Sequence, residues 1–296
     1  ANAVDSITTG DYNVGVGDSA GTAITSGNYN SSVGYEALKA NTTGERNVAI
    51  GRDALSSNTT ADNNTAIGTQ TLSSNITGTA NTAVGYASLN VNTANDNTAV
   101  GFYALVANTT GHTNVAVGKN ALQSNTTGIR NVAVGEGALG SNIAGHTSTA
   151  IGHRALAAFQ GSAGECTAVG TFSQNSNTSG PDNNSFGYGS LDSLTTGAYN
   201  CAFGNISGDA LTTGTENTFV GEASGQSVTT SNYNTMIGNH AGHTTTTGQS
   251  NVCIGNYARM DAASQTNGIV IGDNLSSGGD VFAFGKASNK VYNSFT

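Results

Sequence analysis

The chain has 296 residues, of which 9% are charged, and its formal net charge of −9 comes from 18 acidic and 9 basic residues. Because no basic stripe is present, nucleic-acid binding is not expected. No apolar run approaches the ~20 residues that span a bilayer, so membrane insertion is not expected either. The composition overlaps with that of disordered sequences, but disorder would not keep apolar residues at a fixed phase along the chain.

In chain order, residues 1–12 come first and are expected to form an N-terminal lead-in or cap. Residues 13–272 then repeat the cassette N-x-[AS]-[VI]-G sixteen times, and thirteen of the fifteen intervals between its glycines are seventeen residues. A period this short predicts one coil of an all-β solenoid per repeat, about sixteen coils in all. The closing glycines are Gly17, Gly34, Gly51, Gly68, Gly85, Gly101, Gly118, Gly135, Gly152, Gly170, Gly187, Gly204, Gly221, Gly238, Gly255 and Gly272.

The residues before each closing glycine predict a strand, and positions are numbered from that glycine as position 0. Position −1 is apolar in all sixteen repeats and β-branched in fourteen, which is typical of a strand that faces a core. Position −2 lies on the opposite side of the strand and is mostly Ala. Since an exposed Ala column is unusual, we expect another surface to pack closely against it. The candidate contacts are Ala49, Ala66, Ala83, Ala99, Ala116 and Ala133.

Position −4 is Asn in thirteen of the sixteen repeats. Stacked coils would align these side chains into a ladder of amide hydrogen bonds. The alternative, that the N-x-T/S sequences are glycosylation acceptors, is less favoured. The ladder prediction covers Asn47, Asn64, Asn81, Asn97, Asn114 and Asn131.

After the glycine, Ala or Ser at +3 and Leu at +4 predict a second short strand. A polar N-T-T-G turn follows, as at 41–44 and 125–128, and its Gly is expected to be left-handed. In the second half, Gly replaces Leu at +4 and an apolar residue enters at +7, which indicates a change of cross-section within one solenoid. Residues 273–296 lose the phase and are expected to form a C-terminal cap or to start a further module.

Acid–base and metal chemistry has few candidates. Glu36 and Asp53 share one phase in successive coils, while His153, His240 and His243 lie in two repeats. Solvated turn residues explain both groups better than a catalytic pair or a metal site. We therefore expect no enzymatic activity, no metal and no cofactor. The cysteines Cys166, Cys201 and Cys253 are expected to be small buried thiols.

Two surface patterns remain as candidate binding features. Tyr35, Tyr86, Phe102 and Tyr188 share position +1 and form a possible ligand-facing ridge that could stack on sugars, although aromatic side chains also fill gaps between coils. Paired threonines at +8 and +9, such as Thr42 and Thr43, suggest ice binding as an alternative function. Adjacent strand residues point to opposite sides, however, which weakens that alternative.

The cassettes at 47–51, 81–85 and 114–118 (N-V-A-I-G, N-T-A-V-G and N-V-A-V-G) resemble the head repeats of trimeric autotransporter adhesins, and the longer repeat is similar to repeats of phage tail fibres. The resemblance implies a left-handed parallel β-roll with three chains packed side by side, and it implies that the Ala column at −2 contacts another copy of the chain.

It also implies a fibre segment of a phage or phage-like particle, a virion component that acts as a rigid spacer and attaches to a host surface glycan or protein. The alternatives are the head of a bacterial trimeric adhesin at the cell surface and, more remotely, an ice-binding solenoid or a tailspike hydrolase.

Overall fold

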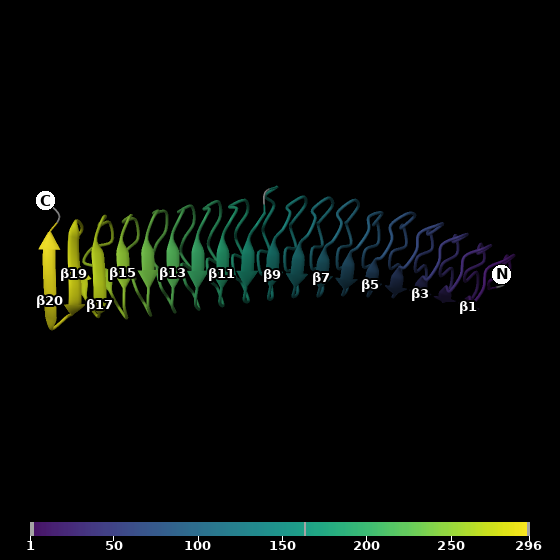
Figure 1. Cartoon of the computed structure of the whole chain (residues 1–296), viewed down its shortest axis with the longest axis horizontal. Helices are drawn as coiled ribbons and strands as arrows, with labels where there is room; N and C mark the ends of the chain where they lie inside the picture. The colour runs from purple at the N-terminus through teal and green to yellow at the C-terminus, as the bar shows by residue number, and fades with distance from the viewer. Residues whose placement is uncertain (1–2, 163, 295–296) are drawn as a thin grey trace. The chain divides into compact units, whose positions relative to one another are not determined.

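The computed structural model describes residues 3–162 and 164–294, and in these residues it is all-β, a parallel β-solenoid of about sixteen turns without a helix. The predicted fold class is confirmed to this extent. The chain divides into two compact units, residues 1–147 and 148–296, and the repeats occur in both. In each unit the strands follow one another in chain order (Figure 1).

The bounds of the strands follow the repeat. The first unit contains β1 (Val14–Val16), β2 (Ser31–Val33), β3 (Val48–Ile50), β4 (Thr65–Ile67), β5 (Thr82–Val84), β6 (Thr98–Val100), β7 (Val115–Val117) and β8 (Val132–Val134). The second unit contains β9 (Thr149–Ile151), β10 (Thr167–Val169), β11 (Asn184–Phe186), β12 (Cys201–Phe203), β13 (Thr218–Val220), β14 (Thr235–Ile237), β15 (Val252–Ile254), β16 (Arg259–Met260), β17 (Ile269–Asp273), β18 (Ser276–Ser277), β19 (Val281–Lys286) and β20 (Asn289–Ser294).

Equivalent strands pair in parallel within each unit, and their register preserves the repeat. Ala49 pairs with Ala66 between β3 and β4, and Ala202 pairs with Phe219 between β12 and β13. Every side chain therefore lies above and below the side chain at the same position of the neighbouring coils.

The expectation of a second strand at +3 and +4 is wrong. These residues lie in a run of turns, and the Leu at +4 has a left-handed backbone, with φ of 49° at Leu55 and 50° at Leu122. Both side chains are nevertheless fully buried. A seventeen-residue coil must turn back on itself within a few residues, and consecutive turns achieve this while keeping Leu inside.

The role of the glycine in the N-T-T-G turn also differs from the expectation. Gly44 is not left-handed; an added Cβ would instead lie 2.5 Å from the carbonyl oxygen of Ala61 in the next coil. The closing glycines combine a left-handed backbone with a carbonyl group of the next coil too close for a side chain. Gly118 has φ of 130°, and its added Cβ would lie 2.7 Å from the carbonyl oxygen of Gly135.

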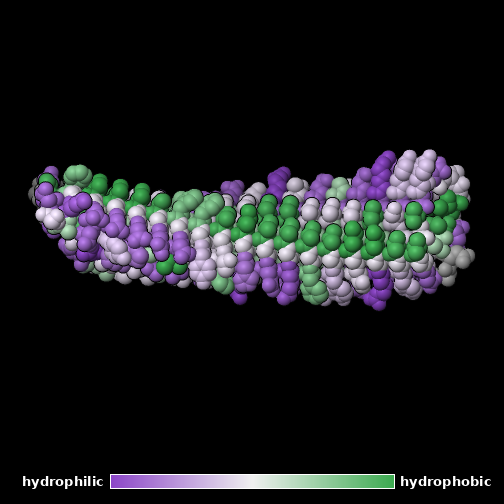
Figure 2. Space-filling view, turned by 90° about the horizontal axis from the view of Figure 1, so that it is seen from below, coloured by the Kyte–Doolittle hydropathy of each residue, from purple (hydrophilic) through white to green (hydrophobic). Residues whose placement is uncertain are grey.

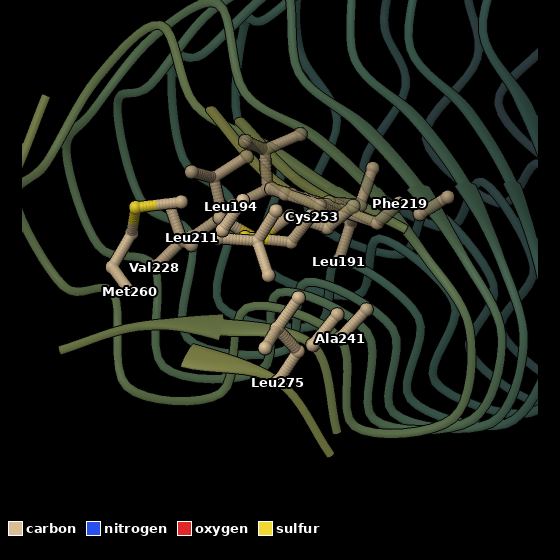
Figure 3. Packing of buried hydrophobic residues seen from close by; sticks show 14 residues of the cluster. Leu191, Leu194, Leu211, Phe219, Val228, Ala241, Cys253, Met260 and Leu275 are labelled. Carbon is tan, nitrogen blue, oxygen red and sulfur yellow. The ribbon is translucent and has the colours of Figure 1, made fainter. Parts of the chain in front are cut away.

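The cores of the two units differ in which position carries the large side chain, −2 or +4. The first unit pairs Ala at −2 with Leu at +4, and both are fully buried. In the second unit Phe219 and Met236 occupy −2, and an added Cβ on Gly208 at +4 would lie 2.6 Å from the Phe219 ring. The predicted change of cross-section is thus a large-for-small exchange (Figure 3).

The two ends of the repeat remain hydrogen-bonded to it. At the N-terminus, Val4 N–H donates to Ala20 O at 2.9 Å and Thr8 N–H donates to Thr25 O at 3.0 Å. At the C-terminus, β19 pairs in parallel with β17, and β20 then pairs antiparallel with β19. β19 and β20 therefore continue the sheet beyond the last repeat.

Candidate interaction surface

The strand faces are oriented opposite to the sequence-based expectation. Ala49, Ala66, Ala83, Ala99, Ala116 and Ala133 have no exposed area within the single chain. They line the chain's own core, so the prediction that they contact another copy is wrong. The β-branched residues at −1 point outward instead; Val16 is 57% exposed, Ile50 40% and Ile67 38%.

Positions −3 and −1 together form the outward side of the strands, which we call the β-face. In the first unit it comprises Val14, Ser31, Val48, Thr65, Thr82, Thr98, Val115 and Val132 at −3, and Val16, Val33, Ile50, Ile67, Val84, Val100, Val117 and Val134 at −1. In the second unit Phe186 and Phe203 occupy −1 in successive coils and stack with ring centroids 4.6 Å apart. Figure 2 shows apolar side chains gathered in stripes along the solenoid surface.

The six asparagines of the predicted ladder are buried and hydrogen-bonded between coils. The side-chain nitrogen of Asn81 donates to Asn64 Oδ1 at 3.2 Å, and Asn131 donates to Asn114 Oδ1 at 3.2 Å. Each also binds the turn at the next coil; Asn47 Nδ2 donates to Ala61 O at 2.9 Å. These amide side chains therefore make, with one another and with the backbone of the turn, the hydrogen bonds that water would otherwise make.

A second asparagine ladder, at position +7 of the first unit, was missed. Asn125 donates to Asn108 Oδ1 and Asn142 donates to Asn125 Oδ1, each at 2.8 Å, and all three side chains are buried. The signal was visible, since this Asn opens the N-T-T-G turn at the repeat period. In the second unit Leu194, Leu211 and Val228 take this position, so one ladder is replaced by apolar packing.

The residues of the predicted aromatic ridge are all exposed, but they form separate clusters. In the first unit the rings of Tyr86 and Phe102 stack with centroids 5.4 Å apart, and Tyr103 packs against both. In the second unit Tyr188 meets the edge of Phe172. Stacked rings cover part of each other's faces, so filling gaps between coils accounts for part of their role.

Tyr35 lies beside a small group of surface charges. Its pKa is raised by a hydrogen bond with Glu36, and the pKa of Glu36 is lowered by its bond with Lys39, where Nζ and Oε1 are 2.9 Å apart. Asp53 pairs with Arg52 at 3.4 Å. Glu36 and Asp53 are therefore each engaged with a cation of their own, which does not resemble a cooperating carboxylate pair.

The histidines pack against rings or backbone. His240 stacks on Tyr257 with centroids 4.7 Å apart, and His243 Nδ1 lies 3.0 Å from His240 O, while His153 meets the edge of Phe172. In the residues that the structure describes, no three His, Cys, Asp or Glu side chains come together as a metal site would require.

The three cysteines are free thiols in two different environments. Cys166 and Cys253 are buried, and burial raises their pKa to about 11 and about 12. Cys201 is half-buried at position −3 of the β-face rather than buried as expected, and partial burial raises its pKa as well.

The threonines at +8 use their hydroxyl groups within the solenoid. Thr42 Oγ1 donates to Thr59 O at 3.1 Å, and Thr126 Oγ1 donates to Ile143 O at 3.1 Å, whereas Thr43 and Thr127 at +9 are exposed. The two columns therefore do not share one surface role.

No family model, curated protein or solved structure matches the chain. Among the described residues, no helix could cross a membrane.

Proposed function

We propose that the chain is a non-enzymatic fibre segment of a phage or phage-like particle. Side-by-side copies would form a rigid spacer and present turn residues to a glycan or protein of the host surface. A homotrimer of left-handed coils is the arrangement that the resemblance to adhesin heads and tail fibres implies.

The observation that carries the proposal is the coupling of each coil to the next. Strand pairing, the Asn ladder at −4 and the Thr hydroxyl bonds at +8 all join equivalent positions of neighbouring coils. Bending would have to stretch these bonds in many coils at once. A spacer needs this property, and the repeat supplies it without a separate core for each coil.

Immuno-electron microscopy tests the proposal. Antibodies raised against the chain should label fibres on particles that carry the gene product. Labelling of bacterial envelopes would favour the adhesin alternative, and labelling of neither would overturn the proposal. Light scattering on the purified chain should give three times the 29.5 kDa of one copy. A monomer would contradict the proposal that copies of the chain lie side by side in a fibre.

A further inference from the structure

We infer that the β-face is the surface through which copies of this chain bind one another. The inference rests on the proposed function, because a side-by-side fibre needs such a surface. The outward columns at −3 and −1 take the place of the Ala column, which is buried within the single chain.

The size of the β-face suits a stable interface. The eight strands of the first unit contribute sixteen outward side chains in two continuous columns, and twelve of these side chains are Val or Ile. Five of the sixteen side chains are exposed and eleven are half-buried, so at on the order of 45 Å² each the unit offers roughly 700 Å², close to the ~800 Å² per partner of a standard interface. Apolar patches on monomers are typically about 300–600 Å².

The charge pattern favours a second copy as the partner. The chain carries a net charge of −9, so two copies repel each other in general. None of the side chains at −3 and −1 in β1–β15 is charged, whereas Arg52, Lys119 and Glu136 lie at +1, beyond the closing glycine. Contact through the β-face therefore buries no like charges, which would otherwise be costly.

The repeat itself is the strongest argument. In the first unit the β-face presents a similar pair of side chains once per coil, Val or Ile at −1 and Val, Thr or Ser at −3, at the spacing of paired strands, ~4.8 Å. A partner must offer matching side chains at that spacing to fill the gaps coil after coil. Another copy of the chain does so along its whole repeat, while an unrelated globular surface matches a few coils at most.

A charge-insertion experiment tests the assignment. Ile67→Glu and Val117→Glu, combined, place two carboxylates on the β-face three coils apart. The matched control combines Thr60→Glu and Thr110→Glu, which place the same charges at exposed +9 positions, also three coils apart. Light scattering gives the molar mass, and circular dichroism checks that each variant keeps the wild-type spectrum.

The expected result is a fall to 29.5 kDa for the β-face variant, with wild-type mass for the control. A folded β-face variant that keeps the wild-type mass overturns this inference and leaves the fibre proposal standing on another surface. A wild-type chain that is itself a monomer overturns both.

A second measurement decides the matter if the β-face variant does not fold. In a Cys201→Ser background, Asn184→Cys places a thiol on the β-face and Thr213→Cys places one at +9; both positions are exposed in the single chain. In the assembled protein we expect maleimide to react at least tenfold more slowly at position 184. Equal rates at the two positions would overturn the inference.

Discussion

Asn97 Oδ1 accepts two hydrogen bonds from Asn114, 3.0 Å from its backbone nitrogen and 3.2 Å from its side-chain nitrogen. Asn114 in turn donates to Gly128 O at 2.8 Å and accepts from the backbone of Asn131 at 3.0 Å. One buried side chain thus links three coils and leaves none of these polar atoms without a partner.

Replacing Asn114 with Ala should destabilise the first unit by about 2–4 kcal/mol, because buried donors and acceptors lose their partners. Thermal or urea unfolding followed by circular dichroism measures the loss. Thr127→Ala, at an exposed position, is the control and should change the unfolding free energy by less than about 0.5 kcal/mol. Equal stability of the two variants would contradict the structural role of the ladder.

Gly118→Ala should destabilise the chain more strongly than Gly140→Ala. Gly118 combines φ of 130° with the close carbonyl of Gly135, whereas Gly140 lies outside the left-handed region, with its nearest contact at 3.1 Å. We expect a loss of about 3 kcal/mol or more at position 118, from backbone strain and the displaced coil together. Soluble yield and unfolding midpoints of the two variants provide the comparison.

Ala80→Gly should change the stability by less than about 0.5 kcal/mol, because relief of backbone strain offsets the entropy that glycine adds to the unfolded chain. Ala80 is exposed and left-handed, with φ of 56°, a conformation that costs a residue with a Cβ about 1 kcal/mol. At Ala107, which is not left-handed, the same change should cost about 0.5–1 kcal/mol through the entropy of the unfolded chain. A loss of stability at position 80 as large as that at 107 would show that its backbone is not strained.

Asp192 and Asp209 occupy position +5 in successive coils of the second unit, and partial burial raises the pKa of both carboxyl groups; the charge of Asp192 also raises that of Asp209. Their protonated forms are therefore favoured in the folded state. This stability is fully present below the unfolded pKa and is lost as pH rises through the folded value.

Changing both residues to Asn should accordingly raise stability at pH 7 by about 0.5–1 kcal/mol and leave it unchanged near pH 3. Unfolding curves at the two pH values measure the difference. Thr213→Ala, an exposed change in the same unit that alters no ionisable group, is the control. A stabilisation that is as large at pH 3 would point to packing rather than to charge.

The sequence predicted those features that depend on the period. Equivalent residues of successive coils had to align, so Asn81 and Asn97 could be assigned to a ladder before their contacts were known. Alternation along a strand likewise showed that Ala99 and Val100 point to opposite sides. It did not show which side faces inward.

That choice depends on the width of the coil. Leu105 at +4 already fills much of the interior, so the strand must offer a small residue such as Ala99 on its inner side. Phe219 can point inward because position +4 holds glycines, Gly208 and Gly225, which have no side chain. The side chains at −2 and +4 must match in size across the coil. The residues of one strand, taken alone, do not show this dependence. The missed candidate surface, the β-face, follows from the same relation.

The sixteen-residue coil shows how tolerant this architecture is to changes of length. The missing residue belongs to the turn after Asn92, where the side chain reaches Ala94 O two residues on rather than three, yet Asn97 N–H still donates to Asn81 Oδ1 at 3.0 Å. Indels confined to that turn leave the neighbouring coils undisturbed. Duplication or loss of a whole seventeen-residue stretch should be equally harmless, so a gene of this kind could adjust the reach of its product by recombination between its own repeats.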